Sequence, residues 1–373
     1  MNTYKKILGI SVAIGMVVAS MLVWILPRKD FSENENRMLQ ELPEYRFENL
    51  INATFGQEVE QYVSDHFPFR DNLVAAKTQT QALIGYRELN GVFLAQDRLL
   101  QHIEMPDTTK LIERTNLLCD NLSDTDAEVY LMVVPTDAQV YRSELPKYAP
   151  EVVDEEPVIK SIYEQVKCKT VDVLEKLKKA KNEGADLYYH LDHHWNYDGA
   201  YVAYTTLCDA MNQTPQNADE LKPVCVTNSF KGSLYSKVLL ESMKPDEIYA
   251  PTEKEEIVVN YVDKNEKKTT YYNDSFLEQK DKYCYFGSGN QALMTIENKS
   301  AENDKELVIV KDSFANSFIP FLIKHYKMIH VIDPRYYRPH ISDYVKQKKN
   351  VADVLLLYNV DSMNINNGIA RIK

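Results

Sequence analysis

Short, unbroken apolar runs separated by stretches with helical periodicity constrain the fold of this chain most strongly. Residues 129–134 read Val-Tyr-Leu-Met-Val-Val and stop at Pro135, and residues 307–310 read Leu-Val-Ile-Val. Runs of this kind are typical of strands that are buried on both faces of a parallel sheet. Helices between such strands imply right-handed crossovers. We therefore predict an α/β fold built on a parallel sheet.

Helical patterns fill the intervals, and further strands complete the sheet. Helices are expected at 108–122, 158–182, 197–212 and 341–348, and additional strands at 91–94, 186–191, 328–332 and 351–358. Asn196 is placed to cap the third of these helices. Upstream, an amphipathic pattern over 55–84 is interrupted at Pro68, because proline breaks or kinks a helix.

The alternation of helices and strands stops between residues 213 and 305. Helical periodicity disappears there, and short β-rich runs such as 257–262 and 292–296 stand between polar turns. We predict that residues 213–305 form a β-rich insertion or a lid over the main sheet.

The first 29 residues have the composition of a membrane segment. Lys5 and Lys6 precede an uncharged apolar run over 7–26, which is long enough to cross a bilayer. Small residues at 18–20 suit cleavage of a signal peptide, but the apolar run continues beyond them, which favours an uncleaved anchor. The two lysines predict a single-pass protein of the cell membrane with its bulk outside.

This placement divides the chain into three parts. We expect residues 1–29 to form the N-terminal membrane anchor or signal peptide, 30–90 to form a tether and an N-terminal helical segment, and 91–373 to form the main domain with its insertion. The net charge of −12 argues against a nucleic-acid partner, because nucleic-acid binding needs a basic surface.

The cysteines exclude one class of metal site and leave their pairing open. They form no CxxC pair, which argues against a zinc ribbon, and their odd number leaves at least one thiol unpaired within a monomer. They are Cys119, Cys168, Cys208, Cys225 and Cys284. We expect no cofactor and no bound metal.

Two polar turns carry the residues needed for nucleophilic catalysis. Asp192 and His194 follow the predicted strand at 186–191, and Ser313 follows the strand at 307–310. Because the carboxyl ends of parallel strands meet at one edge of a sheet, these three side chains can come together. Ser313 would then attack, His194 would act as the general base, and Asp192 would orient the imidazole.

His193 is the competing base, and simpler structural roles exist for each residue. In an extended chain Asp192 and His194 point the same way and His193 points to the other side, which selects His194. Ser313 alone could be a helix N-cap, and the two histidines could be a surface pair beside a structural aspartate.

Four further residues are candidate substrate contacts. Trp195 would wall the pocket, Asn316 is a candidate for the oxyanion hole, and Arg335 ends a strand at the active edge. Tyr235 belongs to the segment 231–235, which either lines the cleft or is a plain turn.

The block Asp192-His193-His194-Trp195 resembles the signature of the DHHW family, which are membrane-anchored bacterial proteins. More broadly, the chain resembles the SGNH-hydrolase-like proteins that acetylate alginate in the periplasm. The matching segments are Glu35-Asn36-Arg37 for their ENR segment, Asp65 to Arg70 for their D-x-FPxR segment, Asp192, His194 and Trp195 for their Asp-x-His-Trp block, and Ser313 for their nucleophile.

This resemblance covers residues 31 to 360 and implies an SGNH-hydrolase-like three-layer α/β/α domain. It implies an O-acetyltransferase or a carbohydrate acetylesterase with a serine nucleophile. One departure concerns Lys311, which stands where the Gly-Asp-Ser block of such esterases has its glycine.

We therefore expect a membrane-anchored extracytoplasmic enzyme that transfers or removes an acyl group on a cell-envelope or exported polysaccharide. The resemblance implies that this acyl group is acetyl. Its partners would be the polysaccharide acceptor and a membrane acyltransferase that supplies acyl groups. One alternative is a non-catalytic envelope module that binds glycan. Another is a metal-dependent phosphoesterase, whose known Asp-His-His type also needs further aspartate motifs and a glycine-rich segment.

Overall fold

The computed structural model describes residues 3–25, 28–32, 37–44, 54–149, 152–364 and 368–372. Its internal contacts divide the chain into two compact units. The N-terminal unit comprises Met1–Tyr86 and Ser236–Ser242, and the main unit comprises Arg87–Tyr235 and Met243–Lys373.

The N-terminal unit contains one helix, α1 (Thr3–Ile25), that is long and apolar enough to cross a membrane. A signal sequence near the N-terminus meets the same criteria. Among its described residues, this unit also contains β1 (Phe31–Ser32), β2 (Arg37–Met38), α3 (Thr54–Asp65) and α4 (Arg70–Leu83). The predicted interruption of the helical pattern is confirmed, and Phe69 at the break has a left-handed φ of 58°. The match at Glu35 and Asn36 lies outside the described residues.

An eight-stranded sheet forms the centre of the main unit, in the order β11-β10-β12-β14-β13-β15-β6-β7. Its last five strands are mutually parallel: β14 (Met328–Ile332), β13 (Glu306–Lys311), β15 (Val351–Asn359), β6 (Glu128–Val134) and β7 (Lys169–Val171). The predicted parallel α/β sheet is therefore confirmed.

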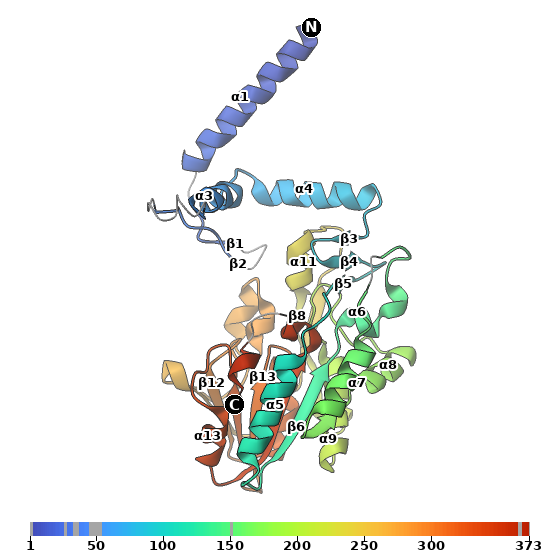
Figure 1. Cartoon of the computed structure of the whole chain (residues 1–373), viewed down its shortest axis with the longest axis vertical. Coiled ribbons are helices and arrows are strands. Elements are labelled where there is room, and N and C mark those ends of the chain that lie inside the picture. The colour runs from blue at the N-terminus through green and yellow to red at the C-terminus, as the bar shows by residue number, and fades with distance from the viewer. Residues whose placement is uncertain are drawn as a thin grey trace. The chain divides into compact units, whose positions relative to one another are not determined.

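Successive residues of a strand point to opposite sides of the sheet, so buried strands make both faces apolar. Helices cover both of these faces. In β6, Tyr130 and Met132 belong to one buried cluster, and Leu131 and Val133 belong to the other. The second cluster includes α5 (Thr109–Leu122), α7 (Glu155–Gln165) and α13 (Ile341–Lys346), and the first includes α9 (Tyr197–Met211) and α12 (Ala315–Leu322). In Figure 1, α5 lies on the near face of the sheet that carries β6 and β13.

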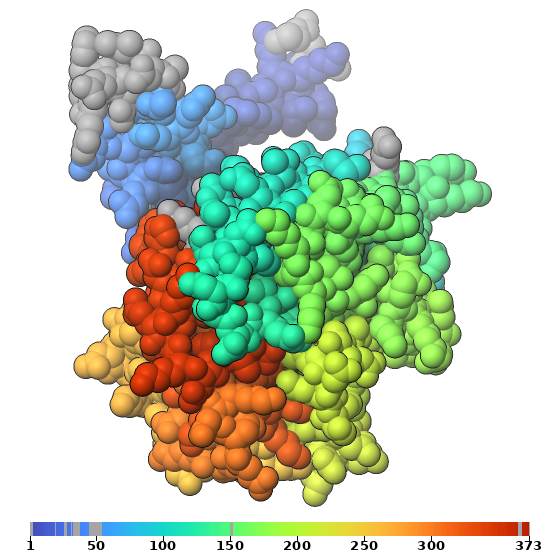
Figure 2. Space-filling model, turned by 60° about the horizontal axis from the view of Figure 1, so that its bottom comes forward, coloured from blue at the N-terminus to red at the C-terminus, as the bar shows by residue number. Residues whose placement is uncertain are grey.

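The C-terminal segment returns to the helical layer formed by α5. Figure 2 shows this segment, in red, beside the teal surface of α5, in agreement with the packing of α13 and the last turn, η7 (Ile369–Arg371), against that helix. The smaller elements of the main unit are β3 (Glu88–Leu89), β4 (Val92–Leu94), β5 (Leu99–Gln101), α6 (Asp137–Val140) and α10 (Ala218–Leu221).

Two predicted elements differ in the structure. The single helix expected at 158–182 is divided into α7 and α8 (Leu174–Asn182), because residues 169–171 between them form the edge strand β7. The strand expected at 186–191 is wrong. Its only β-type pairing is an isolated bridge between Tyr188 and Trp195, since β7 already occupies the edge of the sheet. The residues of the Asp192 block therefore lie on a loop.

The insertion is β-rich, as predicted, but its expected position as a lid over the sheet is wrong for three of its strands. β10 (Ile257–Tyr261), β11 (Glu266–Lys268) and β12 (Leu293–Asn298) extend the main sheet as antiparallel strands beyond β14. The strands β8 (Val224–Phe230) and β9 (Asp246–Ala250) form a separate antiparallel pair, with α11 (Ser233–Val238) between them in the sequence. Alternation in β10 buries Ile257, Val259 and Tyr261, so these strands behave as part of the core.

Candidate active site

Three side chains from two distant parts of the main unit form a hydrogen-bonded relay. His194 Nδ1 lies 2.5 Å from Asp192 Oδ1, and His194 Nε2 lies 2.8 Å from Ser313 Oγ. Asp192 and His194 are 3% and 5% exposed. When Nδ1 donates to the carboxylate, Nε2 accepts the hydroxyl proton of Ser313. This is the arrangement of a nucleophile, a base and an orienting acid.

The surroundings of Asp192 favour its ionised form. Oδ1 accepts the backbone N–H of His194 at 3.0 Å, and Oδ2 accepts the backbone N–H of Ser233 at 2.7 Å. Burial alone would raise the pKa of Asp192, but His194 and His193 outweigh burial and hold that pKa well below its usual range. The carboxylate can therefore stabilise the imidazolium that forms when His194 takes a proton.

Gly232 lets the chain pass directly beside this carboxylate. A methyl group on Gly232 would lie 2.3 Å from both Cβ and Oδ2 of Asp192. No side chain can occupy that space unless Asp192 moves, and the neighbouring Ser233 N–H bond would move with it. The glycine thus sets the position of the triad's acid.

We expect Gly232→Ala to lower turnover roughly ten- to a hundred-fold, because small displacements of catalytic groups have effects of this size. Gly56→Ala is the control, since a methyl group at Gly56 would meet nothing within 4 Å. Both variants are compared on one activated ester, with thermal unfolding measured in parallel. Full activity of a folded Gly232→Ala protein would show that the Asp192 position is not critical.

The turn that carries Ser313 is fixed by Asp312. Its Oδ1 accepts the Phe314 N–H at 2.9 Å, and its Oδ2 accepts the Asn359 N–H and the Ser362 hydroxyl, each at 2.6 Å. Within the part of the chain that the structure describes, the Ser313 N–H donates to no acceptor. It precedes α12, where the helix dipole favours negative charge, so it can donate to an oxyanion.

Trp195 lies behind the site. It is 0% exposed, and its Nε1 donates to Phe314 O at 3.0 Å and to Ser317 Oγ at 3.1 Å. These bonds tie residues 190–195, called the histidine loop below, to the start of α12. Trp195 is therefore part of the core behind the relay, and its expected role as a pocket wall stays a prediction.

Tyr283 fixes the plane of the His194 ring. The residue belongs to the 3₁₀ turn η4 (Lys282–Tyr285) of the insertion, and its ring stacks on that of His194 with centroids 3.9 Å apart. Its hydroxyl lies 3.1 Å from both Ser313 O and Ser317 Oγ. The insertion therefore contributes directly to the geometry of the relay.

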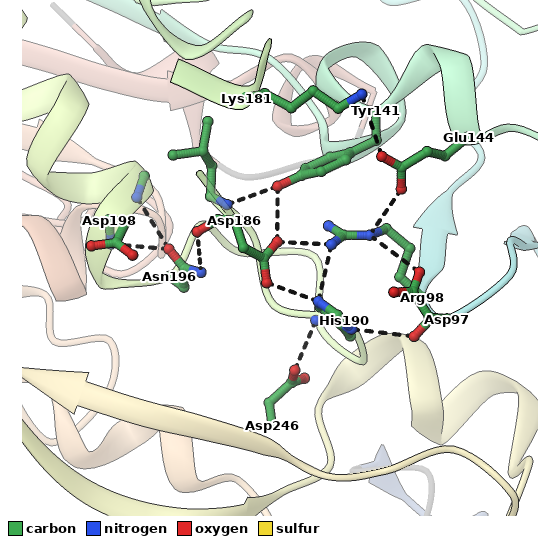
Figure 3. Close-up of polar contacts among 12 residues, drawn as sticks. Asp97, Arg98, Tyr141, Glu144, Lys181, Asp186, His190, Asn196, Asp198 and Asp246 are labelled. Carbon is green, nitrogen blue, oxygen red and sulfur yellow. Dashed lines mark hydrogen bonds and ion pairs between the residues drawn. The ribbon is translucent and has the colours of Figure 1, made fainter. Parts of the chain in front are cut away.

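A charged network holds the loop that leads into the triad (Figure 3). Arg98 Nη2 donates to Asp186 Oδ1 at 2.7 Å, and His190 Nε2 lies 2.8 Å from Asp186 Oδ2. Asp246 accepts the backbone N–H groups of His190 and of the next residue, at 2.9 and 2.8 Å. Burial raises the pKa of Asp246 to about 6. Burial would also raise the pKa of Asp186, but the bonds from His190 and Arg98 lower it to about 2.

Asn316 lies near the serine turn with its amide orientation fixed. The backbone N–H of Asn316 donates to Ser313 O at 3.1 Å, and the side-chain Oδ1 accepts a hydrogen bond from Lys311 Nζ at 2.5 Å. Because lysine only donates, the Asn316 oxygen must face Lys311 and the NH₂ group must face elsewhere. That group has one long contact of 3.4 Å, to Asn290 Oδ1. Burial lowers the pKa of Lys311 to about 8.

The last two expected substrate contacts are both engaged within the protein. Arg335 Nη2 pairs with Asp333 Oδ2 at 2.6 Å, so its guanidinium is already satisfied on one side. Tyr235 is 6% exposed, and its backbone N–H donates to Leu191 O at 3.0 Å. Tyr235 therefore lies next to the histidine loop. Arg335 is held by Asp333, which directly follows the end of β14.

His193 does not point away from His194, contrary to the expectation from strand alternation. Residues 190–194 form bends rather than extended backbone, and the two imidazole rings lie with centroids 3.9 Å apart. His193 Nδ1 lies 2.6 Å from Ser233 Oγ. Of the two histidines, it is His194 whose Nε2 lies within hydrogen-bond distance of Ser313 Oγ.

The same loop has the composition of a metal site. One ligand atom each from Asp192, His193 and His194 lies within 4.8 Å of the others. Both ring nitrogens of His194 already face partners, at Asp192 and Ser313, so binding a metal would break one of these contacts. The donor set therefore fits the hydrogen-bonded relay better than a metal ion.

Sequence reasoning missed Asp246 and Tyr283, and it singled out Gly232 and Ser233 only as part of the segment 231–235. Gly232, Ser233, Asp246 and Tyr283 all contact the histidine loop from the insertion. Their segments have no catalytic pattern, and the only available signal was the turn at 231–235.

The fold and the relay together define a three-layer α/β domain that carries a hydrogen-bonded Asp-His-Ser relay. The chain belongs to the DHHW family, because the model of the DHHW protein matches residues 115–332, more than half of its length. A comparison with curated protein sequences gives no match.

Solved structures share this fold at low sequence identity. A DHHW family protein from Eubacterium siraeum is 22% identical, with a TM-score of 0.65 over 76% of this chain and 95% of that protein. Bacillus cereus PatB1 is 20% identical, with a TM-score of 0.63 over 76% of this chain and 99% of its own. A second PatB1 structure, with a sulfonyl adduct, is 19% identical with a TM-score of 0.60, over 74% of this chain and 98% of its own.

Proposed function

We propose that this protein is a membrane-anchored, extracytoplasmic enzyme that transfers or removes an acetyl group on a cell-envelope or exported polysaccharide. The observation that carries the proposal is the relay of Asp192, His194 and Ser313, with contacts of 2.5 and 2.8 Å. Acyl chemistry follows from this relay, because it activates a hydroxyl as a nucleophile. The acetyl group and the glycan rest on the resemblance to the alginate-acetylating proteins.

The reaction has two steps. Ser313 Oγ attacks the acyl carbonyl while its proton passes to His194 Nε2, and Asp192 stabilises the imidazolium. The Ser313 N–H, with the Asn316 amide as a second candidate donor, binds the oxyanion. His194 then protonates the leaving alkoxide and leaves an acyl-serine. In the second step a glycan hydroxyl or water gives its proton to His194 and attacks the ester. The imidazolium then returns that proton to Ser313 Oγ as it leaves, which restores the relay.

The test uses 4-nitrophenyl acetate, with and without an oligosaccharide acceptor. We expect nitrophenol release that is unaffected by EDTA, and acetylated oligosaccharide if the acceptor is accepted over water. Loss of activity in EDTA and its recovery with manganese would contradict the serine mechanism and favour a metal site at Asp192, His193 and His194.

The proposed topology gives a separate prediction. Protease added to intact protoplasts should digest the main unit, because Lys5 and Lys6 precede the apolar helix α1. A cytoplasmic protein serves as the protected control. Complete protection of the main unit would contradict the extracytoplasmic placement.

A further inference from the structure

Two lysines lie over one tyrosine ring next to the histidine loop. Lys231 Nζ lies 4.5 Å from the centre of the Tyr235 ring, and Lys280 Nζ lies 5.0 Å from the same centre. Lys231 Nζ also donates to the Tyr235 hydroxyl at 3.3 Å. Both distances are within the range of cation–π attraction, so the ring holds two ammonium groups close together.

Both lysine segments contact the triad's own residues. Lys231 precedes Gly232, which lies directly against the Asp192 carboxylate. Lys280 lies three positions before Tyr283, whose ring stacks on His194 at 3.9 Å. The two ammonium groups are therefore carried by the same segments that shape the relay.

The pair carries positive charge that no ion pair among the described residues neutralises. Within the described ranges, neither lysine forms an ion pair with a carboxylate, although the chain has a net charge of −12. Burial and the charge of Lys231 lower the pKa of Lys280, and the neighbouring Asp281 offsets this only in part. Two like charges held this close repel each other, and an anion between them would relieve that repulsion.

We propose that Lys231 and Lys280, held by Tyr235, bind an anionic group of the substrate, so that the acceptor is an acidic glycan. The proposal rests on the proposed acyl-transfer function and adds the substrate class. The anionic group is a carboxylate or a phosphodiester of the glycan, and the compact charge of lysine can bind either of them. The negative charge of the whole chain does not predict this preference, because it averages over the surface.

Binding is measured calorimetrically at low salt with the full-length protein in detergent. This protein carries Ser313→Ala, which prevents turnover. The three probes are oligogalacturonate, oligomeric glycerol phosphate and an uncharged cello-oligosaccharide. We expect at least one anionic probe to bind about ten-fold or more tightly than the uncharged one, with the preferred probe identifying carboxylate or phosphate. Adding Lys231→Met and Lys280→Met should remove that preference, and adding Lys231→Arg and Lys280→Arg should retain it.

The control adds Lys176→Met and Lys179→Met to the same Ser313→Ala protein. These lysines lie on α8 opposite acidic partners, Asp209 at 4.0 Å and Glu183 at 3.9 Å, so the net charge changes equally. This control should keep the preference for the anionic probe. Equal binding of all three probes, or a preference that survives removal of Lys231 and Lys280, would overturn the proposal. Since binding is measured without turnover, failure of 4-nitrophenyl acetate hydrolysis would count against the proposed function alone.

Discussion

Replacing Ser313 with alanine is expected to lower turnover of 4-nitrophenyl acetate by at least about a thousand-fold. The relay places its hydroxyl 2.8 Å from His194 Nε2, and no acyl-enzyme can form without that oxygen. The exposed Ser275 provides a control, because Ser275→Ala changes the same atom away from the relay. Turnover is measured for both variants after their folding has been checked by thermal unfolding. Unchanged turnover in folded Ser313→Ala would exclude Ser313 as the nucleophile.

The second large effect separates the two adjacent histidines. His194→Ala should match Ser313→Ala, and the double variant should be no worse than either, because the two residues act as one unit. His193→Ala should cost about ten-fold or less, since His193 contacts Ser233 rather than the nucleophile. Asp192→Asn should fall between them, because it disturbs the tautomer while the imidazole remains.

The comparison of the three variants on one ester decides which histidine is the base. An inactive His193→Ala protein together with an active His194→Ala protein would contradict the assignment. Such a result would mean that the histidine loop changes its conformation when substrate binds.

The sheet could be predicted because its strands are encoded locally. Residues 130–134 and 307–310 are buried on both faces, and an apolar run with no alternation is the direct consequence. Asn196 was predictable as a cap for the same reason, since its side chain accepts the N–H groups of Asp198 and Gly199. These features depend on neighbouring residues only.

Features that depend on distant contacts could not be predicted. The run at 186–191 resembles a strand, but the edge of the sheet is taken by β7, and the run is held instead by Arg98 and Asp246. The insertion extends the sheet because β12 pairs with β14, which no local pattern reveals. Gly232 resembles any turn glycine until Asp192 is seen beside it.

The candidate site shows the same division. Asp192, His194 and Ser313 were selected by residue type, by position at polar turns and by resemblance, and the structure brings them together. The burial of Trp195 was not predictable, because residue type does not reveal which side of a loop faces solvent. Tyr283 lies in a segment without periodicity, so only its stacking on His194 reveals its position.

Covalent labelling of Ser313 tests the central claim most directly. The probe is an aryl sulfonyl fluoride, which reacts with an activated serine hydroxyl, and the adduct is located by peptide mass spectrometry. We predict one adduct, on the peptide that contains Ser313, with loss of turnover in proportion to labelling and with slow labelling in His194→Ala. Complete loss of activity without an adduct on Ser313, or full activity in protein labelled there, would contradict the account.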